Sequence, residues 1–299
     1  MSLLVCGTLA FDSIETPYDK RPDMIGGSAT YFAHAARYFT PVQLVGVVGT
    51  DFPDSVIADF KQRNIDTRGL EVAEGKTFRW AGRYEADWNT RTTLDTQLNV
   101  FADFDPKVPE DFKGSEFVFL ANAAPALQMQ ALEQVKSPKF VVADTMNLWI
   151  EQTRADLDTL LTKVDGLVIN DEEAFLLTGK RNLFQAAQQI LESGPKYLIL
   201  KKGEHGAFLF GEGVRFALPA YPVAEVVDPT GAGDSFAGGF MGYLTSVANI
   251  EPATLKRAML YGTATASFCV EGFSVEALGV QNRERVESRY NELHSLLTV

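Results

Sequence analysis

Residues 224–244 read AEVVDPTGAGDSFAGGFMGYL, and this stretch decides the fold prediction. The apolar run at residues 224–227 is typical of a short strand, and Pro229 holds Asp228 in an extended conformation before a turn. Helical spacing follows to about Leu244, although each glycine in this helix costs roughly 0.8 to 1 kcal/mol relative to alanine. The stretch therefore predicts a strand, a tight turn and a helix whose backbone another group approaches closely.

The first turn of this predicted helix can bind an anion. It offers unpaired N–H groups and the positive end of the helix dipole, which suit the oxygens of a phosphoryl group. The dipole alone would stabilise the carboxylate of Asp234 there. Beside a phosphate that carboxylate repels, unless it accepts the proton of an attacking hydroxyl. A Walker A loop has Lys where Asp234 stands, and a Rossmann fingerprint has Gly where Phe236 stands, so neither motif matches.

Short apolar, β-rich runs alternate with helical patterns along the rest of the chain. Such runs are typical of strands buried on both faces. The alternation predicts an α/β fold, a three-layer sandwich with a mostly parallel central sheet flanked by helices. The expected strands are residues 3–6, 43–48, 117–120, 140–143, 167–170, 197–200 and 224–227, and the expected helices are residues 28–38, 53–63, 127–135, 183–193, 254–268 and 283–297.

Residues 76–84 and 91–101 break this alternation. Both segments are rich in Thr, aromatic and alternating polar residues, and no helix separates them, which predicts a β-hairpin outside the main sheet. Together with residues 14–24 they are expected to form a small β-sheet lid over a cleft. We therefore expect a single domain over residues 1–299 with an inserted lid, and exposed lid strands favour pairing with a second copy in a homodimer.

The composition restricts partners and location. With 27 basic and 39 acidic residues the formal charge is -12, which excludes a broad basic surface for nucleic acid or anionic lipid. No window approaches a transmembrane length, and the first residues lack a basic stretch ahead of a long apolar run, which argues against a signal peptide. Cys6 and Cys269 form no CxxC pair. We expect a cytoplasmic protein without nucleic-acid or membrane partners.

Residues 228–234 resemble the C-terminal signature of the ribokinase-like, or PfkB, carbohydrate kinases, Asp-x-Thr-Gly-Ala-Gly-Asp, at every position. The resemblance implies an ATP-dependent kinase that phosphorylates a hydroxyl of a small sugar-like molecule. It implies that Asp234 is the catalytic base and that the amides of Gly231, Ala232 and Gly233 form an anion hole. It also suggests Thr230 as a contact on the cofactor side, and in some relatives backbone carbonyls in this region hold a monovalent cation such as K⁺.

Asp12, Gly26 and Gly27 resemble the family's elements beside the sugar. Two glycines permit close approach of a ligand, and a carboxylate can accept hydrogen bonds from two hydroxyls. A turn with Ser28 as helix N-cap explains the glycines without a ligand, and an Asp here is often a simple turn residue. Asn147 follows a predicted strand and resembles a family position in the substrate cleft, or it caps a loop.

Asn170 and Glu173 stand where a predicted strand meets a helix, and they resemble the family's Asn-x-x-Glu motif that orders magnesium and phosphates. The same spacing is a capping box, which needs no ligand. Mg²⁺ takes oxygen ligands and usually keeps several waters, so Glu173 is the candidate metal residue, acting through water.

Residues 201–206, KKGEHG, resemble the nucleotide-side turn that often begins Thr-x-Gly in relatives. Lys202, Gly203 and Gly206 are the candidate ATP contacts in this turn. Lys201 replaces the Thr. A cation at this point would suit the triphosphate electrostatically, although a lysine at the end of a strand is usually solvated.

Two alternatives to a sugar kinase stay open. One is a nucleoside kinase of the same family, in which Trp80 or Trp88 would clamp the base. The other is a regulator that binds nucleotide without catalysis. Activity on a nucleoside would favour the first, and ATP binding without turnover would favour the second.

Overall fold

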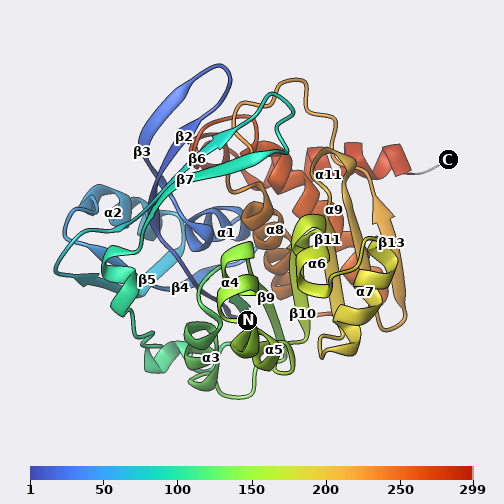
Figure 1. Ribbon diagram of the computed structural model, residues 1–299, viewed down its shortest axis with the longest axis horizontal. Helices are drawn as coiled ribbons and strands as arrows, with labels where there is room; N and C mark the ends of the chain where they lie inside the picture. The colour runs from blue at the N-terminus through green and yellow to red at the C-terminus, as the bar shows by residue number, and fades with distance from the viewer. Residues whose placement is uncertain (298–299) are drawn as a thin grey trace.

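The computed structural model describes residues 1–297, and its largest feature is a nine-stranded, mostly parallel sheet with helices on both faces (Figure 1). The strand order is β13-β12-β11-β10-β9-β8-β1-β4-β5. Neighbouring strands from β11 to β5 are parallel, and β12 and β13 are added antiparallel at one edge. The strands are β1 (Leu3–Cys6), β4 (Val42–Gly49), β5 (Ile65–Ala73), β8 (Phe117–Leu120), β9 (Phe140–Asp144), β10 (Gly166–Asn170), β11 (Tyr197–Lys201), β12 (Ala207–Gly211) and β13 (Val214–Leu218).

Two apolar cores form because successive strand residues face opposite sides of the sheet. In β1, Leu3 and Val5 belong to one core, and Leu4 and Cys6 belong to the other. The first core is covered by α1 (Ser28–Ala36), α2 (Asp54–Gln62), α8 (Ala232–Val247), α9 (Pro252–Cys269), α10 (Glu276–Gly279) and α11 (Arg283–Leu297), and the second by α3 (Pro125–Glu133), α4 (Asn147–Gln152), α5 (Arg154–Leu161), α6 (Asp171–Thr178) and α7 (Leu183–Glu192). The predicted three-layer α/β sandwich is confirmed.

A separate four-stranded sheet, the lid sheet, stands above the large sheet in the view of Figure 1. Its order is β3 (Lys20–Gly26), β2 (Ala10–Glu15), β6 (Phe78–Tyr84) and β7 (Arg91–Gln97). Strands β2 and β6 are parallel, and the other two pairs are antiparallel. The small second sheet is therefore confirmed. Its last strand is shorter than predicted, because residues 99–103 form a 3₁₀ turn.

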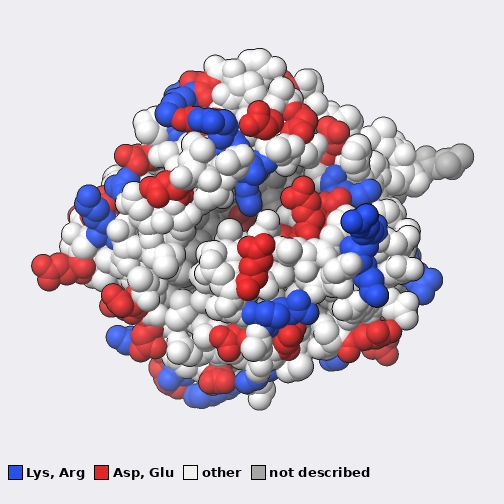
Figure 2. All heavy atoms as spheres, viewed as in Figure 1, with Lys and Arg blue, Asp and Glu red and all other residues white. Residues whose placement is uncertain are grey.

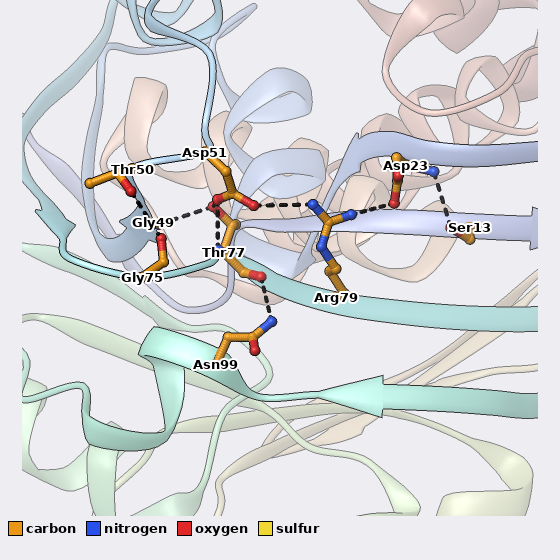
Figure 3. A network of polar contacts seen from close by, with 9 residues as sticks. All are labelled: Ser13, Asp23, Gly49, Thr50, Asp51, Gly75, Thr77, Arg79 and Asn99. Carbon is orange, nitrogen blue, oxygen red and sulfur yellow. Dashed lines mark hydrogen bonds and ion pairs between the residues drawn. The ribbon is translucent and has the colours of Figure 1, made fainter.

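A polar network fastens the start of β6 to the end of β4 (Figure 3). The Asp51 carboxylate accepts hydrogen bonds from the backbone N–H and hydroxyl of Thr77, at 2.7 and 2.6 Å, and from the Arg79 guanidinium at 3.1 Å. The Gly49 N–H donates to the Thr77 hydroxyl at 2.9 Å, and the Asn99 amide donates to the Thr77 carbonyl oxygen at 2.9 Å. These bonds fix the base of the lid sheet on the large sheet.

Residues 224–227 do not form the predicted strand. They run as a loop between β13 and α8, and two of the four are exposed. The N–H groups of Val227 and Asp228 both point to the Val270 carbonyl oxygen beyond α9, at 2.8 and 3.4 Å. The apolar pattern therefore reflects partial burial against the end of α9, and no sheet partner is involved.

Two observations bear on the environment of the protein. Within residues 1–297 no helix has both the length and the apolar character needed to cross a membrane. Cys6 and Cys269 are both buried and free.

Helix α8 packs directly on α1, and this contact sets the position of its first turn. A Cβ atom on Gly238 would lie 2.3 Å from the carbonyl oxygen of Phe32 and 2.8 Å from the Cβ of Ala35. A Cβ atom on Gly242 would lie 2.9 Å from the backbone of Ala36. The close approach predicted from these glycines is therefore an approach by α1.

We expect Gly238→Val to lower the free energy of unfolding by about 2 kcal/mol, because overpacking a filled contact costs about 1 to 3 kcal/mol. Gly114→Val is the matched control, since no atom lies within 4 Å of a Cβ added at Gly114. Urea denaturation of both variants measures the difference. Equal midpoints would show that α1 and α8 do not need this close contact.

Candidate active site

The first turn of α8 carries Asp234 next to backbone amides. Gly231 caps the helix with φ 76, in the left-handed region that favours glycine, and a Cβ atom there would lie 2.3 Å from the Tyr31 ring. Within residues 1–297 the Ala232 N–H donates to a carbonyl oxygen of the preceding turn at 3.2 Å, whereas no backbone hydrogen bond starts at Gly231 or Gly233. Two of the three amides predicted to form an anion hole can therefore bind a ligand.

Two carboxylates and one lysine gather beside Asp234 in this turn. Asp144 ends β9, Glu173 lies in the first turn of α6 after β10, and Lys201 ends β11. These three strands are neighbours and parallel, so their carboxyl ends share one edge of the sheet. Lys201 interacts electrostatically with Asp144, Glu173 and Asp234. Its Nζ atom lies 2.6 Å from the position that a Cβ on Gly233 would take.

Three acidic side chains, Asp144, Glu173 and Asp234, surround the ammonium of Lys201. Burial raises the pKa of Asp234 to about 8, with a further rise from Asp144 and an opposing effect of Lys201. Burial also raises the pKa of Asp144, which Lys201 and a hydrogen bond with Asp234 counteract. Burial lowers the pKa of Lys201, but the neighbouring carboxylates raise it by more. The lysine therefore stays charged, and the two aspartates compete for one proton.

The residues predicted beside the sugar lie together where the lid sheet meets α1. Asp12 in β2 is 4% exposed, and its Oδ2 atom accepts a hydrogen bond from the Gly27 N–H at 3.3 Å. A Cβ atom on Gly26 would lie 1.9 Å from the same oxygen. Burial raises the pKa of Asp12 to about 7, and Asp12 in turn contributes to the raised pKa of Asp234. Gly27, and not Ser28, is the N-cap of α1.

Asn170 and Glu173 form the capping box that their spacing allowed. The Asn170 side chain accepts a hydrogen bond from the Glu173 N–H, and Glu173 Oε2 accepts one from the Asn170 N–H, both at 2.8 Å. Glu173 is 6% exposed, and burial raises its pKa to about 7. The capping box uses one carboxylate oxygen, so a helix-capping role does not prevent Glu173 from facing a ligand.

The predicted nucleotide-side turn forms, but only part of it faces the lid sheet. The Lys202 N–H donates to the Gly206 carbonyl oxygen at 2.8 Å. Gly203 has φ 51, and a Cβ atom there would lie 2.3 Å from Asn89 Oδ1 in the turn between β6 and β7. Gly206 has φ 87 and packs on the end of β13. The Lys202 ammonium lies over the Phe208 ring, 5.7 Å from its centroid.

Asn147 makes no contact with this cluster among the interactions within residues 1–297. It is exposed at the start of α4, and within residues 1–297 its side chain makes no hydrogen bond. The neighbouring Asn122 instead accepts a hydrogen bond from the Trp149 indole at 2.9 Å. The substrate-binding role of Asn147 stays a prediction.

The sequence analysis assigned no site role to four residues of this region. Lys201 and Asp144 each end an apolar strand with a charge, in YLILK and FVVAD, and that shared pattern was an available signal. Tyr84 in β6 places its hydroxyl 3.3 Å from that of Thr230. Arg91, opposite Tyr84 in the β6–β7 register, interacts electrostatically with Lys201. No local pattern indicates that these two lid residues reach the site.

Figure 2 shows that the face below the β6–β7 hairpin is hollowed and bordered by both acidic and basic side chains. Two other concavities of the surface lie elsewhere. One is lined by Tyr221 and Glu292 among others, and the second by Arg68 and Lys107 among others. Neither contains a residue of the acid and lysine cluster.

The fold and this cluster agree with a comparison against known families. Residues 24–280 match the model of the pfkB family of carbohydrate kinases. The chain therefore belongs to the PfkB carbohydrate kinase family, phosphotransferases that act on a hydroxyl group.

Individual relatives in this family carry several names. The chain is 30% identical over 247 residues to the cytidine kinase of Thermococcus kodakarensis, which covers 81% of this chain and 87% of that protein. It is 31% identical over 284 residues to the deoxyribokinase of Salmonella typhi, covering 91% and 87%.

Solved structures show the same fold at low identity. The nucleoside kinase of Burkholderia thailandensis in complex with inosine superposes with a TM-score of 0.81 at 19% identity, over 98% of this chain and 99% of that one. An Escherichia coli protein described as a ribokinase II, in complex with ATP and Mg²⁺, superposes with a TM-score of 0.80 at 21% identity, over 97% and 99%.

We expect Asp234→Asn to stabilise the ligand-free protein more at pH 8.5 than at pH 5.0. The pKa of Asp234 is raised from 3.8 to about 8. Its contribution to stability is therefore fully present below pH 3.8 and is lost as the pH rises to about 8. Asn does not titrate, so the difference in Tm between variant and wild type should grow over this range. A pH-independent difference in Tm would show that neither burial nor neighbouring charge raises the pKa of Asp234.

Proposed function

We propose that this chain transfers the γ-phosphoryl group of ATP to a hydroxyl of a small sugar or sugar-like polyol. The observation that carries the proposal is the position of Asp234. It lies in the first turn of α8, beside the unused amides of Gly231 and Gly233 and within electrostatic reach of Lys201. A phosphoryl group needs such amides and such a cation, and an attacking hydroxyl needs a base at the same point.

In the proposed reaction the acceptor oxygen bonds to the γ-phosphorus, its proton passes to the Asp234 carboxylate, and ADP leaves. Burial and the neighbouring Asp144 raise the pKa of Asp234, which makes its carboxylate a stronger acceptor for the hydroxyl proton. The amides of Gly231 and Gly233 would stabilise the charge on the phosphoryl oxygens, with a smaller share from Ala232 because its N–H already has a partner. Asp12 and Gly27 would orient the acceptor through its other hydroxyls.

Mg²⁺ would come with the nucleotide and neutralise its phosphates. No group of three or more His, Cys, Asp and Glu within residues 1–297 is placed to hold a metal ion. A nucleotide-borne Mg²⁺ takes only one or two carboxylates, with phosphates and water as the other ligands. Glu173 fits this need through water, because it is buried near the first turn of α8 and one of its oxygens lies outside the capping box. The E. coli structure with ATP and Mg²⁺ supports this proposal.

A monovalent cation such as K⁺ has a candidate position next to the signature. Asp228 is fully buried, and its Oδ2 atom has no hydrogen-bond partner within the described part of the chain. Its Oδ1 atom accepts a hydrogen bond from the Thr230 N–H at 2.9 Å. A cation held by carbonyls around Asp228 would satisfy the unpaired oxygen, which supports the proposal of K⁺ as a cofactor.

The remaining expectations stay predictions. Strands β3 and β7 are the edges of the lid sheet, and every residue of β7 is exposed. Edge strands offer unpaired N–H and C=O groups, which favours a homodimer through the lid. The cytoplasmic location and the single domain over residues 1–299 are further predictions of this kind.

We expect Asp234→Asn to cut kcat at least about 100-fold while ATP binding is retained, because a general base contributes about that factor or more. The assay couples ADP release to a screen of sugars, polyols and nucleosides. Asp156→Asn is the matched control, since Asp156 also lies in a first helical turn but is exposed. Near-normal turnover of Asp234→Asn would refute the role of the base, and ATP binding by the wild type without turnover of any acceptor would favour a nucleotide-binding regulator.

A nucleoside is the second candidate acceptor, and the inner face of the lid sheet favours it. Trp80 lies directly opposite Asp12 in the β2–β6 register, so both side chains face the same side. Trp80, Met24 and Val227 pack on a small apolar cluster of Ile14, Tyr84 and Phe273. An apolar, aromatic wall beside a carboxylate that binds sugar hydroxyls suits a ribose with an attached base. The names of the Thermococcus and Burkholderia relatives support this candidate.

If the acceptor is a nucleoside, we expect Trp80→Ala to raise its KM at least about tenfold, because stacking of one base on an aromatic side chain is worth about 1 to 3 kcal/mol. The KM of a free sugar such as ribose should stay within about threefold. Tyr18→Ala is the control, since Tyr18 is a lid aromatic that is 81% exposed. Equal effects of Trp80→Ala on nucleosides and ribose would contradict a base clamp at this position.

A further inference from the structure

We propose that Lys201 is a catalytic residue whose ammonium contacts the γ-phosphoryl group during its transfer. The inference rests on the proposed kinase function, and it adds a residue that lies outside the Asp-x-Thr-Gly-Ala-Gly-Asp signature. It also replaces our own interpretation of Lys201 as a solvated lysine at the end of a strand.

The backbone of Lys201 is fixed on both sides. It pairs with Asn170 of β10 on one side and with Ala207 of β12 on the other. The side chain therefore leaves a rigid position at the carboxyl edge of the sheet. Its end runs along the first turn of α8, with Nζ, Cε and Cδ at 2.6, 3.5 and 3.6 Å from the position of a Cβ on Gly233. Only glycine at position 233 leaves room for this approach.

The ammonium has no direct partner in this position. Asp144, Glu173 and Asp234 attract it, but within residues 1–297 Lys201 Nζ forms neither a hydrogen bond nor a close ion pair with any of them. Lys201 is half-buried, and its ammonium carries three N–H donors that a ligand entering beside the turn can use. A tetrahedral group with several oxygens, placed between Nζ and the amides of the α8 turn, would satisfy both sets of donors.

The place of Lys201 along the nucleotide follows from its neighbour. Asp234, the next residue after Gly233, is proposed to take the proton of the hydroxyl that attacks the γ-phosphorus. A cation beside this turn therefore lies at the transferring group. The rest of the proposed nucleotide turn, residues 202–206, meets other segments, with Gly203 against Asn89 of the lid hairpin and Gly206 against the end of β13. We therefore assign Lys201 to the γ-phosphoryl group, and residues 202–206 to the part of ATP that remains as ADP.

A contact with the γ-phosphoryl group has a specific kinetic consequence. Lys201→Met should lower kcat at least about 100-fold, as the loss of one preorganised donor to a transition state does. The Kd of ADP should stay within about threefold of wild type, because ADP lacks the γ-phosphoryl group. Lys201→Arg should recover at least tenfold of the lost kcat, because it restores the charge. A structural role alone would not separate kcat from ADP binding in this way.

The experiment compares Lys201→Met, Lys201→Gln and Lys201→Arg by coupled ADP release and by calorimetric titration with ADP. Lys196→Met is the matched control, because Lys196 precedes the other end of β11, where it forms an ion pair with Asp165. If the Met variant does not fold, the Gln variant decides through the same two measurements. Retention of kcat within about threefold would overturn the proposal, and so would a loss of ADP affinity equal to the loss of kcat. Wild-type protein that binds ADP but phosphorylates no acceptor would instead overturn the kinase function itself.

Discussion

The structure depends on one electrostatic constraint, the crowding of three carboxylates around one ammonium at the carboxyl edge of the sheet. Burial alone disfavours each carboxylate, and their proximity makes the cost larger, since two like charges at short range do not both ionise easily. Lys201 offsets part of this cost for Asp144, Glu173 and Asp234. Such an arrangement adds little stability, because buried charges seldom do. Its charges are suited to bind an anion together with a counter-ion. The parallel strands β9, β10 and β11 bring Asp144, Glu173 and Lys201 together.

The position of the proposed base is set by packing and not by helix propensity. Helix α8 contains glycines that weaken it as an isolated helix. In the folded chain these glycines allow α1 to approach to backbone contact, and Gly231 allows the Tyr31 ring to lie against the turn. The free energy that the glycines cost the helix is offset by burial between α1, α8 and α9, whose side chains belong to one core. The first turn is thereby held rigidly against the large sheet, as preorganised amide donors require.

Most of the fold could be predicted because its signals are local. Apolar runs between helical patterns are sufficient to predict a parallel sheet. A hairpin pattern without an intervening helix is sufficient to predict the lid sheet. The predicted strand at residues 224–227 was wrong because a short, largely apolar run looks the same in a strand and in a loop that packs on a helix end. In the proposed site, Asp234 could be singled out because its motif is contiguous. Lys201 was misjudged because its environment comes from three other segments, and Arg91 approaches only through the geometry of the lid sheet. Contacts between segments far apart in the chain are what the sequence alone does not reveal.

The lid sheet has a further physical role that follows from the strength of the proposed base. A carboxylate with a raised pKa beside a γ-phosphoryl group would also activate water, and ATP would then be hydrolysed without an acceptor. One hairpin touches both halves of the site: Trp80 stands opposite Asp12 on the acceptor side, and Asn89 lies against Gly203 in the proposed nucleotide turn. The Tyr84 hydroxyl of the same hairpin lies 3.3 Å from that of Thr230. If the acceptor and the nucleotide bind as proposed, a single element would cover both, so exclusion of water and alignment of the acceptor would depend on the same contacts.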